Sequence, residues 1–118
     1  MTILRGELYF VELGPTRGRE IDAKRRPVLV ISINYINRKQ WVVTVIPGKT
    51  KDPADRSYKE EALVQQTPSN GLTNLTAFRC DQLKAVDHSR FDKPPIGVVS
   101  AADLQRIEDT VKFCLGLV

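Results

Sequence analysis

The apolar residues of this chain occur in short runs of at most five to seven, separated by polar or turn-forming residues. Such runs, rich in valine and isoleucine, are typical of β-strands, whereas a membrane-spanning helix needs about 20 apolar residues. We therefore expect no membrane span and a mainly β fold. The expected strands cover residues 7–13, 26–32, 41–46, 61–66, 75–79 and 84–87; Pro47-Gly48 is expected to end the third, leaving 49–57 as a mobile loop.

The C-terminal segment follows a helical period instead. Ser100, with Asp103 three residues later, is typical of a helix start, because the serine hydroxyl accepts a hydrogen bond from a free backbone amide. The apolar positions that then share one helix face are Leu104, Ile107, Val111, Cys114 and Leu115. Five or six strands and one helix predict a single domain, residues 1–118, forming a small mainly β barrel that the C-terminal α-helix covers.

Positive charge is concentrated in the first half of the chain. The formal net charge is +4; residues 1–60 hold 12 Lys or Arg against 7 Asp or Glu, and residues 61–118 hold 6 against 7. The segment from Pro15 to Arg26 carries five of the basic residues. A basic surface attracts polyanions through long-range steering and counterion release, so a nucleic acid is a candidate partner, although a merely solvated basic face gives the same count.

Residue types that hold metals are scarce. Cys80 and Cys114 form no CxxC pair, and the chain has one histidine, so we expect two reduced, at least partly buried thiols, no metal site and no cofactor. The N-terminal residues Met1–Arg5 lack the charged and apolar regions of a signal peptide, which favours a cytoplasmic location.

Arg79-Cys80-Asp81 is the segment best suited to chemistry. On an extended strand, Arg79 and Asp81 leave one face and Cys80 the other. RNA cleavage through its own 2′-hydroxyl needs a base, cationic donors for the phosphorus and a proton for the 5′ oxygen. Asp81 is the candidate base, although a neighbouring arginine weakens it; Arg26 and Arg79 are candidates to hold the phosphate. A surface ion pair, or a pair within a dimer interface, is the structural alternative.

His88 lies in a polar turn after a strand and is not expected to be essential, since a single imidazole proves nothing about proton transfer.

The chain closely resembles the MazF/PemK/Kid family of bacterial toxin endoribonucleases over nearly its full length. The segments that carry the resemblance are Arg5-Gly6-Glu7-Leu8-Tyr9, the Pro-x-x-Gly loop of residues 15–18, Arg26-Pro27-Val28-Leu29-Val30, Arg79-Cys80-Asp81-Gln82-Leu83 with Val86-Asp87, and the terminal helix. Each segment alone is weakly specific, but their order and spacing are strongly so.

The resemblance implies an SH3-like barrel that forms a homodimer and binds single-stranded RNA across the dimer face. It implies metal-independent, sequence-selective cleavage that leaves a 2′,3′-cyclic phosphate and a 5′-hydroxyl. It also implies a cognate antitoxin, whose acidic flexible segment covers the basic groove, and no DNA binding by the toxin alone.

Position by position, the resemblance assigns Arg26 as the catalytic arginine and Arg79 and Asp81 to acid and base roles. Arg19 stands where one branch of the family has a functional histidine, so here it can only bind or stabilise. The remaining expected RNA-binding residues are Arg17, Arg25, Lys49 and Thr50.

Two departures from the family pattern bear on the site. The loop before Arg26 is one residue longer than the common pattern, which makes Arg25 an alternative to Arg26. Pro47 replaces a substrate-contacting Thr or Ser at the end of the third strand, so Thr50, or Thr44 in a shifted register, would have to supply the hydroxyl, and Lys49 a phosphate contact.

Two other functions compete with the ribonuclease. One is a non-enzymatic toxin resembling CcdB, which binds DNA gyrase through its C-terminal helix; the apolar end Phe113–Val118 suits packing or docking better than a charged epitope. The other is a family member that has lost cleavage and binds only RNA or its antitoxin, for which the replacement by Pro47 gives a reason.

Overall fold

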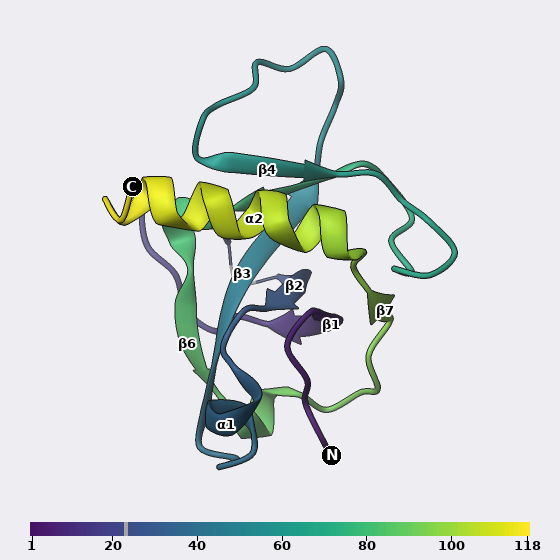
Figure 1. Ribbon diagram of the computed structural model, residues 1–118, viewed down its shortest axis with the longest axis vertical. Helices are drawn as coiled ribbons and strands as arrows, with labels where there is room; N and C mark the ends of the chain where they lie inside the picture. Colours follow the sequence, from purple (N-terminus) through teal and green to yellow (C-terminus); the bar gives the residue numbers. More distant parts are fainter. Residues whose placement is uncertain (23) are drawn as a thin grey trace.

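The computed structural model describes residues 1–22 and 24–118. Figure 1 shows a mainly β molecule with one long helix lying across it. The strands are β1 (Glu7–Glu12), β2 (Arg25–Val30), β3 (Val42–Thr50), β4 (Glu61–Val64), β5 (Thr76–Arg79), β6 (Lys84–Asp87) and β7 (Gly97–Val98). The helices are α1 (Asn34–Asn37) and α2 (Ala101–Cys114), and the 3-10 turns are η1 (Cys80–Gln82) and η2 (His88–Arg90).

The strands form one strongly bent sheet, a half-barrel, in the order β4-β5-β3-β2-β1-β7, with β6 also paired to β3. Its long strand β3 belongs to both halves of the bend. The first part of β3 pairs with β2 and β6, and its last three residues pair with β5. All the pairs in which β3 takes part are antiparallel.

The expectation that Pro47-Gly48 ends the third strand is wrong. Pro47 is the last residue of β3 that stands opposite β2, and Gly48 is the first that stands opposite Phe78 of β5. A proline is tolerated where a strand changes partners, since its missing N–H then breaks no continuous ladder. A Cβ on Gly48 would lie 2.8 Å from the Thr76 methyl and 2.9 Å from the Phe78 ring. Because Gly48, Lys49 and Thr50 all pair with β5, the strand continues to Thr50, and Lys49 is not in a loop.

Apolar side chains fill both faces of the bent sheet. One cluster gathers around Tyr9, Val28 and Val45, and a second gathers around Leu29 and Phe78. Alternate residues of β2 serve the two clusters, as the period of a strand requires.

Helix α2 covers the second cluster. Its Ile107 is fully buried, and Leu104, Val111 and Cys114 pack against the same cluster. Ser100 accepts the hydrogen bond from the Asp103 amide at 3.1 Å, which confirms the expected helix start. Leu115, expected on the buried face, lies just past the helix end and is 51% exposed.

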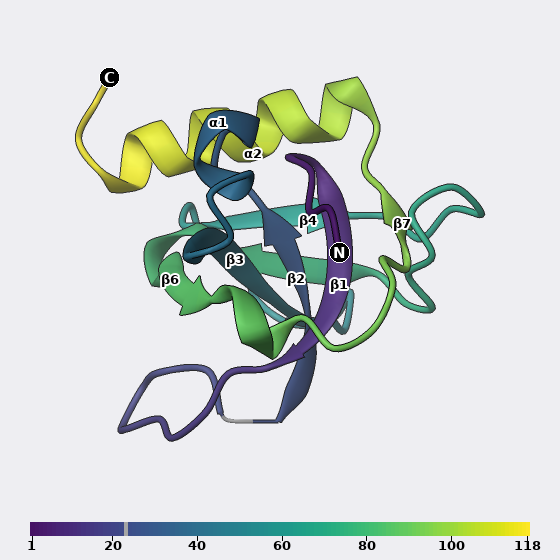
Figure 2. The same ribbon diagram turned by 90° about the horizontal axis from the view of Figure 1, so that it is seen from below.

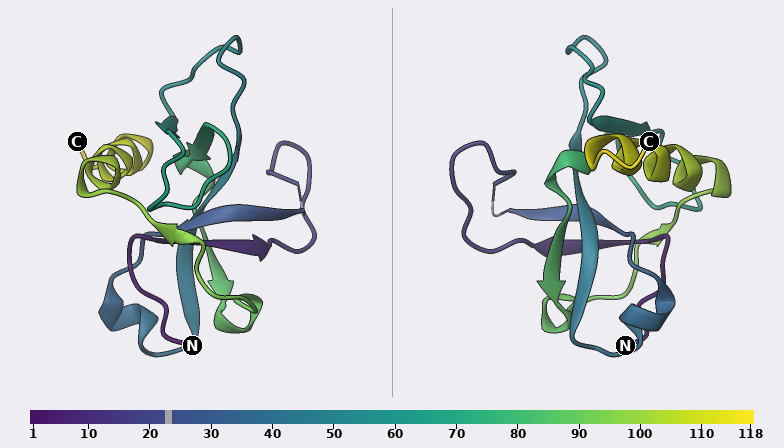
Figure 3. Two further views of the ribbon diagram at one scale, coloured as in Figure 1. Left: turned by 90° about the vertical axis from the view of Figure 1, so that its right-hand side faces the viewer. Right: turned by 60° about the vertical axis from the view of Figure 1, so that its left-hand side comes forward.

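The described residues of the connection between β1 and β2, 13–22 and 24, are called the β1–β2 loop below. Figure 2 and Figure 3 show it projecting from the sheet on the side away from α2. The short helix α1, which the sequence pattern did not indicate, lies at the far end of β3 from this loop (Figure 3). Within the described residues, no helix is long and apolar enough to cross a membrane.

Candidate functional site

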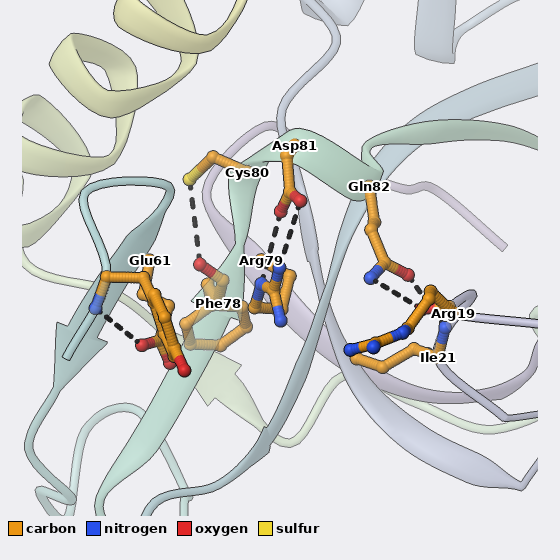
Figure 4. A network of polar contacts seen from close by, with 9 residues as sticks. Arg19, Ile21, Glu61, Phe78, Arg79, Cys80, Asp81 and Gln82 are labelled. Carbon is orange, nitrogen blue, oxygen red and sulfur yellow. Dashed lines mark hydrogen bonds and ion pairs between the residues drawn. The ribbon is translucent and has the colours of Figure 1, made fainter. Parts of the chain in front are cut away.

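The Arg79–Asp81 pair forms where β5 ends. The Arg79 Nε donates to Asp81 Oδ1 at 3.1 Å, and its Nη2 donates to Oδ2 at 2.9 Å (Figure 4). Arg79 and Asp81 were expected to leave the same face of one extended strand, and this expectation is wrong. Cys80, Asp81 and Gln82 form the 3-10 turn η1 instead. The tight turn brings the carboxylate back over the guanidinium, and Cys80 lies buried in the second apolar cluster.

The Arg79 guanidinium is suited to binding an anion. Burial lowers the pKa of Arg79, but the hydrogen bonds and charge of Asp81, with the charges of Glu61 and Glu60, outweigh burial and raise that pKa above its usual value. A guanidinium that stays protonated cannot donate its proton readily, so it stabilises a phosphate through charge and hydrogen bonds. Within the described part of the chain its Nη1 has no hydrogen-bond partner.

A hollow of about 270 Å³, called the Asp81 hollow below, separates η1 from the β1–β2 loop. Asp81 and Gln82 line one side, and Thr16, Glu20 and Ile21 line the loop side. The other lining residues are Leu13, Pro47, Leu83 and Lys84. Pro47 thus adds no hydroxyl to the hollow, whereas the loop brings the hydroxyl-bearing Thr16.

Gln82 joins the two sides of this hollow. Its Oε1 accepts from the Ile21 amide at 2.7 Å, and its Nε2 donates to the Arg19 carbonyl at 3.2 Å, as Figure 4 shows. The expected RNA-binding residues Arg17 and Arg19 are exposed on this loop.

A second hollow of about 270 Å³, called the Arg79 hollow, lies on the other side of the ion pair. Lys49 and Thr50 from the end of β3 line it together with Arg79, so three of the expected site residues come together here. Arg56 and Tyr58 also line it, and the Arg56 guanidinium lies 5.4 Å from the centre of the Tyr58 ring. Its remaining lining residues are Lys51, Asp55 and Glu61.

Arg25 and Arg26 point to opposite faces of β2. Arg25 pairs with Asp92 at 2.9 Å and lines a different hollow with Glu12 and Arg90. Arg26, with its side chain 17% exposed, pairs with Asp22 at 2.6 Å. The hydrogen bond from Arg26 holds the pKa of Asp22 below its usual value. Over the described chain, Arg26 lines neither the Asp81 hollow nor the Arg79 hollow.

The cysteines are both free. Burial, followed by the charges of Cys114 and Asp81, raises the pKa of the Cys80 thiol to about 12. Burial likewise raises the pKa of Cys114. Across residues 1–22 and 24–118, no group of three His, Cys, Asp or Glu side chains is placed to hold a metal ion.

Several polar residues that line the two hollows were not predicted as site residues, among them Gln82, Arg56 and Tyr58. Gln82 belongs to a quoted motif, but no spacing rule indicated that it would contact a loop sixty-odd positions away. Arg56 lies in the segment 49–57 that was expected to be a mobile loop, and Tyr58 directly follows that segment; periodicity carries no information there. Their basic and aromatic character was the only signal available.

This geometry occurs in a chain that matches a known family model along almost its entire length. The model, described as PemK-like, MazF-like toxin of type II toxin-antitoxin system, matches residues 4–115. The chain belongs to this family. The resemblance stated from the sequence motifs is thereby confirmed.

Relatives within the PemK/MazF-like family include two ribonucleases of Mycobacterium tuberculosis (strain H37Rv). Endoribonuclease MazF9 is 32% identical over 118 residues, covering 96% of each chain. Endoribonuclease MazF6 is 32% identical over 82 residues, covering 66% of this chain and 71% of the relative.

Solved structures of the family share the architecture. MazF from Deinococcus radiodurans superposes with a TM-score of 0.81 at 18% identity, over 98% of both chains. A mycobacterial endoribonuclease solved in complex with its cognate antitoxin gives a TM-score of 0.75 at 24% identity, over 98% of this chain and 97% of the other. These likenesses confirm the expected fold class, a small mainly β barrel with a C-terminal α-helix, which the strongly bent sheet forms as a half-barrel.

Proposed function

We propose that this PemK/MazF-like chain is a toxin endoribonuclease that cuts single-stranded RNA at selected sequences without a metal ion, in the cytoplasm. The observation that carries the proposal is the Arg79–Asp81 pair, which stands between two hollows. The loop beside the Asp81 hollow carries the exposed Arg17 and Arg19, and the cations that line the Arg79 hollow with Arg79 are Lys49, Lys51 and Arg56. The endoribonuclease relatives support the reaction type.

In this proposal the arginines bind and stabilise the scissile phosphate. Nη1 of Arg79 offers donors to a phosphate oxygen while Nε and Nη2 hold Asp81. Arg26 is the second arginine, and we prefer it to Arg25 because Arg25 is directed to Asp92 on the other face of β2. RNA phosphate would take the place of Asp22 at Arg26, exchanging one charge-assisted partner for another.

Asp81 is the proposed base. It takes the proton of the 2′-hydroxyl, and the 2′ oxygen bonds to the adjacent phosphorus. The bond to the 5′ oxygen breaks as that oxygen takes a proton from a solvent water, and Asp81 then returns its own proton to the solvent. The products are a 2′,3′-cyclic phosphate and a 5′-hydroxyl, with no water consumed. Both Asp81 oxygens already accept a hydrogen bond from Arg79. The 2′-hydroxyl must therefore donate to a free lone pair of the carboxylate, or displace one of the two Arg79 hydrogen bonds.

Binding of the rest of the RNA is assigned to the exposed cations around the two hollows. Arg17 and Arg19 on the loop side, and Lys49 with Thr50 on the β3 side, would contact the backbone on either side of the cut. We further propose a homodimer, and neutralisation by a cognate antitoxin whose acidic segment would cover these cations. The mycobacterial neighbour solved in complex with its cognate antitoxin supports an antitoxin partner.

The test is cleavage of several long single-stranded RNAs in EDTA by the purified protein and by Arg79→Ala, with the fragment ends mapped. Discrete cuts with cyclic phosphate ends, reduced about 10² to 10⁴-fold by Arg79→Ala, are expected from the usual contributions of charge stabilisation. Arg106→Ala is the matched control, because it removes an exposed arginine that pairs with Asp103 on α2, outside both hollows.

Absence of cuts by a folded protein would overturn the proposal and favour the inactive or gyrase-binding alternative. Normal cutting by Arg79→Ala would leave the activity standing and remove the assigned site.

A further inference from the structure

The segment from η1 to η2 holds the β1–β2 loop through the loop's main chain. Gln82 contacts the loop tip at Arg19 and Ile21. Nearer the root of the loop, the Arg90 Nη1 donates to the Glu12 carbonyl at 3.1 Å, and the Lys84 Nζ donates to the Leu13 carbonyl at 3.4 Å. The loop that projects in Figure 2 is therefore attached at both its root and its tip.

We propose that Gln82 is a positioning residue that latches the tip of the β1–β2 loop onto η1 and so sets the width of the Asp81 hollow before RNA enters. This inference rests on the proposed ribonuclease function. It adds a residue to which no role in RNA cleavage has been given above.

The chemistry of the contact requires an amide side chain. The Ile21 N–H needs an acceptor and the Arg19 carbonyl needs a donor, and a carboxamide offers one of each from a single planar group. A carboxylate lacks the donor and an ammonium lacks the acceptor. Gln82 immediately follows Asp81, so the latch fixes the loop relative to the proposed base itself.

The loop tip is already ordered within itself. The Arg17 amide donates to Glu20 Oε1 at 2.6 Å, and the Glu20 amide donates to the Arg17 carbonyl at 3.0 Å. These bonds close residues 17–20 into one hydrogen-bonded unit. The position of this unit, which carries Arg17 and Arg19, is then set by Gln82.

The root of the loop is fixed independently of the latch. Gly14 has φ +76, and a Cβ there would lie 2.8 and 2.9 Å from the two Arg90 terminal nitrogens. The guanidinium therefore packs directly on the glycine backbone. Loss of Gln82 should free the tip while leaving the root and the sheet in place.

The expected kinetic consequence is in KM. A free loop tip must be ordered when RNA binds, and this cost applies equally to the bound ground state and the transition state. Unlatching should therefore raise KM and leave kcat nearly unchanged. Loss of Arg79 or Asp81 should instead lower kcat.

The experiment compares Gln82→Ala and Gln82→Met with the unaltered protein. Gln82→Met keeps most of the side-chain volume and removes both hydrogen bonds. Amide hydrogen exchange of Ile21 should become about 10 to 100 times faster in both variants, as expected for loss of two hydrogen bonds. KM for a cleaved RNA should rise about tenfold with kcat within about twofold. Gln105→Met is the control, since the exposed Gln105 side chain bonds, among the described residues, only to Asp109 on α2.

Unchanged Ile21 exchange in both variants would overturn the latch, and so would a Gln82→Met enzyme with unaltered KM, because packing alone would then explain the contact. The exchange measurement needs no RNA, so it distinguishes failure of the latch from failure of the ribonuclease proposal. Equal melting temperatures of both variants and the control would show that global unfolding is not the cause.

Discussion

Two ion pairs lie at neighbouring positions of the sheet and differ in their surroundings. In the β4–β5 register Glu61 stands opposite Arg79. The Glu61 carboxylate accepts from Lys51 at 3.3 Å, with side chains 3% and 6% exposed, whereas Arg79 and Asp81 are 21% and 37% exposed. Lys51 also donates to the Arg56 carbonyl at 2.6 Å. The buried pair thus organises the β3–β4 connection, and the more exposed pair can exchange one partner for a ligand.

The comparison implies that chemistry and stability can be separated by mutation at adjacent positions. Breaking a buried pair leaves an uncompensated charge in a site of low dielectric constant. Breaking a partly exposed pair leaves a charge that water can reach. The predictions below test this separation.

The largest effect is expected from Asp81→Asn, on cleavage. Removing the proposed base should lower kcat by about 10² to 10⁴-fold, while the free energy of unfolding changes by no more than about 1 kcal/mol. Single-turnover RNA cleavage and urea denaturation measure the two quantities. Full activity in Asp81→Asn would assign the proton transfer to another group.

Lys51→Met should give the largest loss of stability. Leaving Glu61 buried without its cation should cost about 3 to 5 kcal/mol of unfolding free energy. Lys59→Met, in the same connection but exposed, is the matched control. Adding Glu61→Gln to Lys51→Met should recover part of the loss, as a double-mutant cycle would show. A Lys51→Met protein as stable as Lys59→Met would contradict the comparison.

A smaller effect on stability is expected from Cys80. This residue lies between Arg79 and Asp81 in the sequence, but its side chain is buried in the second apolar cluster. Its native pKa of about 12 exceeds the usual thiol value near 8.5, so above about pH 9 the unfolded chain loses a proton that the native protein keeps. Stability should therefore fall as pH rises from about 9 to 12, by up to about 1.4 kcal/mol per pH unit.

The measurement is the unfolding free energy as a function of pH for the unaltered protein and for Cys80→Ala. The variant loses packing at every pH, so only the slopes are compared. A slope that is the same in both proteins would show that Cys80 does not contribute.

The smallest effect is expected at His88. It lies in η2, with its Nε2 buried and, over the residues described, without a hydrogen-bond partner. It lines neither of the hollows beside the ion pairs. His88→Ala should keep cleavage within about twofold of the unaltered protein; a loss above tenfold would reassign the proton transfers proposed for Asp81.

Local pattern predicted most of this fold. The alternation of β1 and the helical stripe of α2 are short-range signals, and both elements form where expected. The continuation of β3 through Pro47 was not predictable locally, because it depends on β5 taking over from β2 as the partner. Helix α1 has only four residues and leaves no periodic signal.

The site was predicted in part. The Arg79–Asp81 pair was found from spacing, although a 3-10 turn makes the contact. The Lys51–Glu61 pair was not found, since its partners meet only after β3, β5 and β4 have paired. The roles given to Arg26, Arg79 and Asp81 remain predictions that the cleavage experiments test.

The attachment of the β1–β2 loop has a consequence for how such proteins diversify. Gln82, Lys84 and Arg90 all contact main-chain atoms of this loop or its root, which every residue type but proline provides in full. The side chains of Arg17, Arg19 and Lys24 can therefore be exchanged during evolution without shifting the backbone that presents them. We expect close homologues to differ in the RNA sequence that they prefer while the backbone conformation of this loop stays the same.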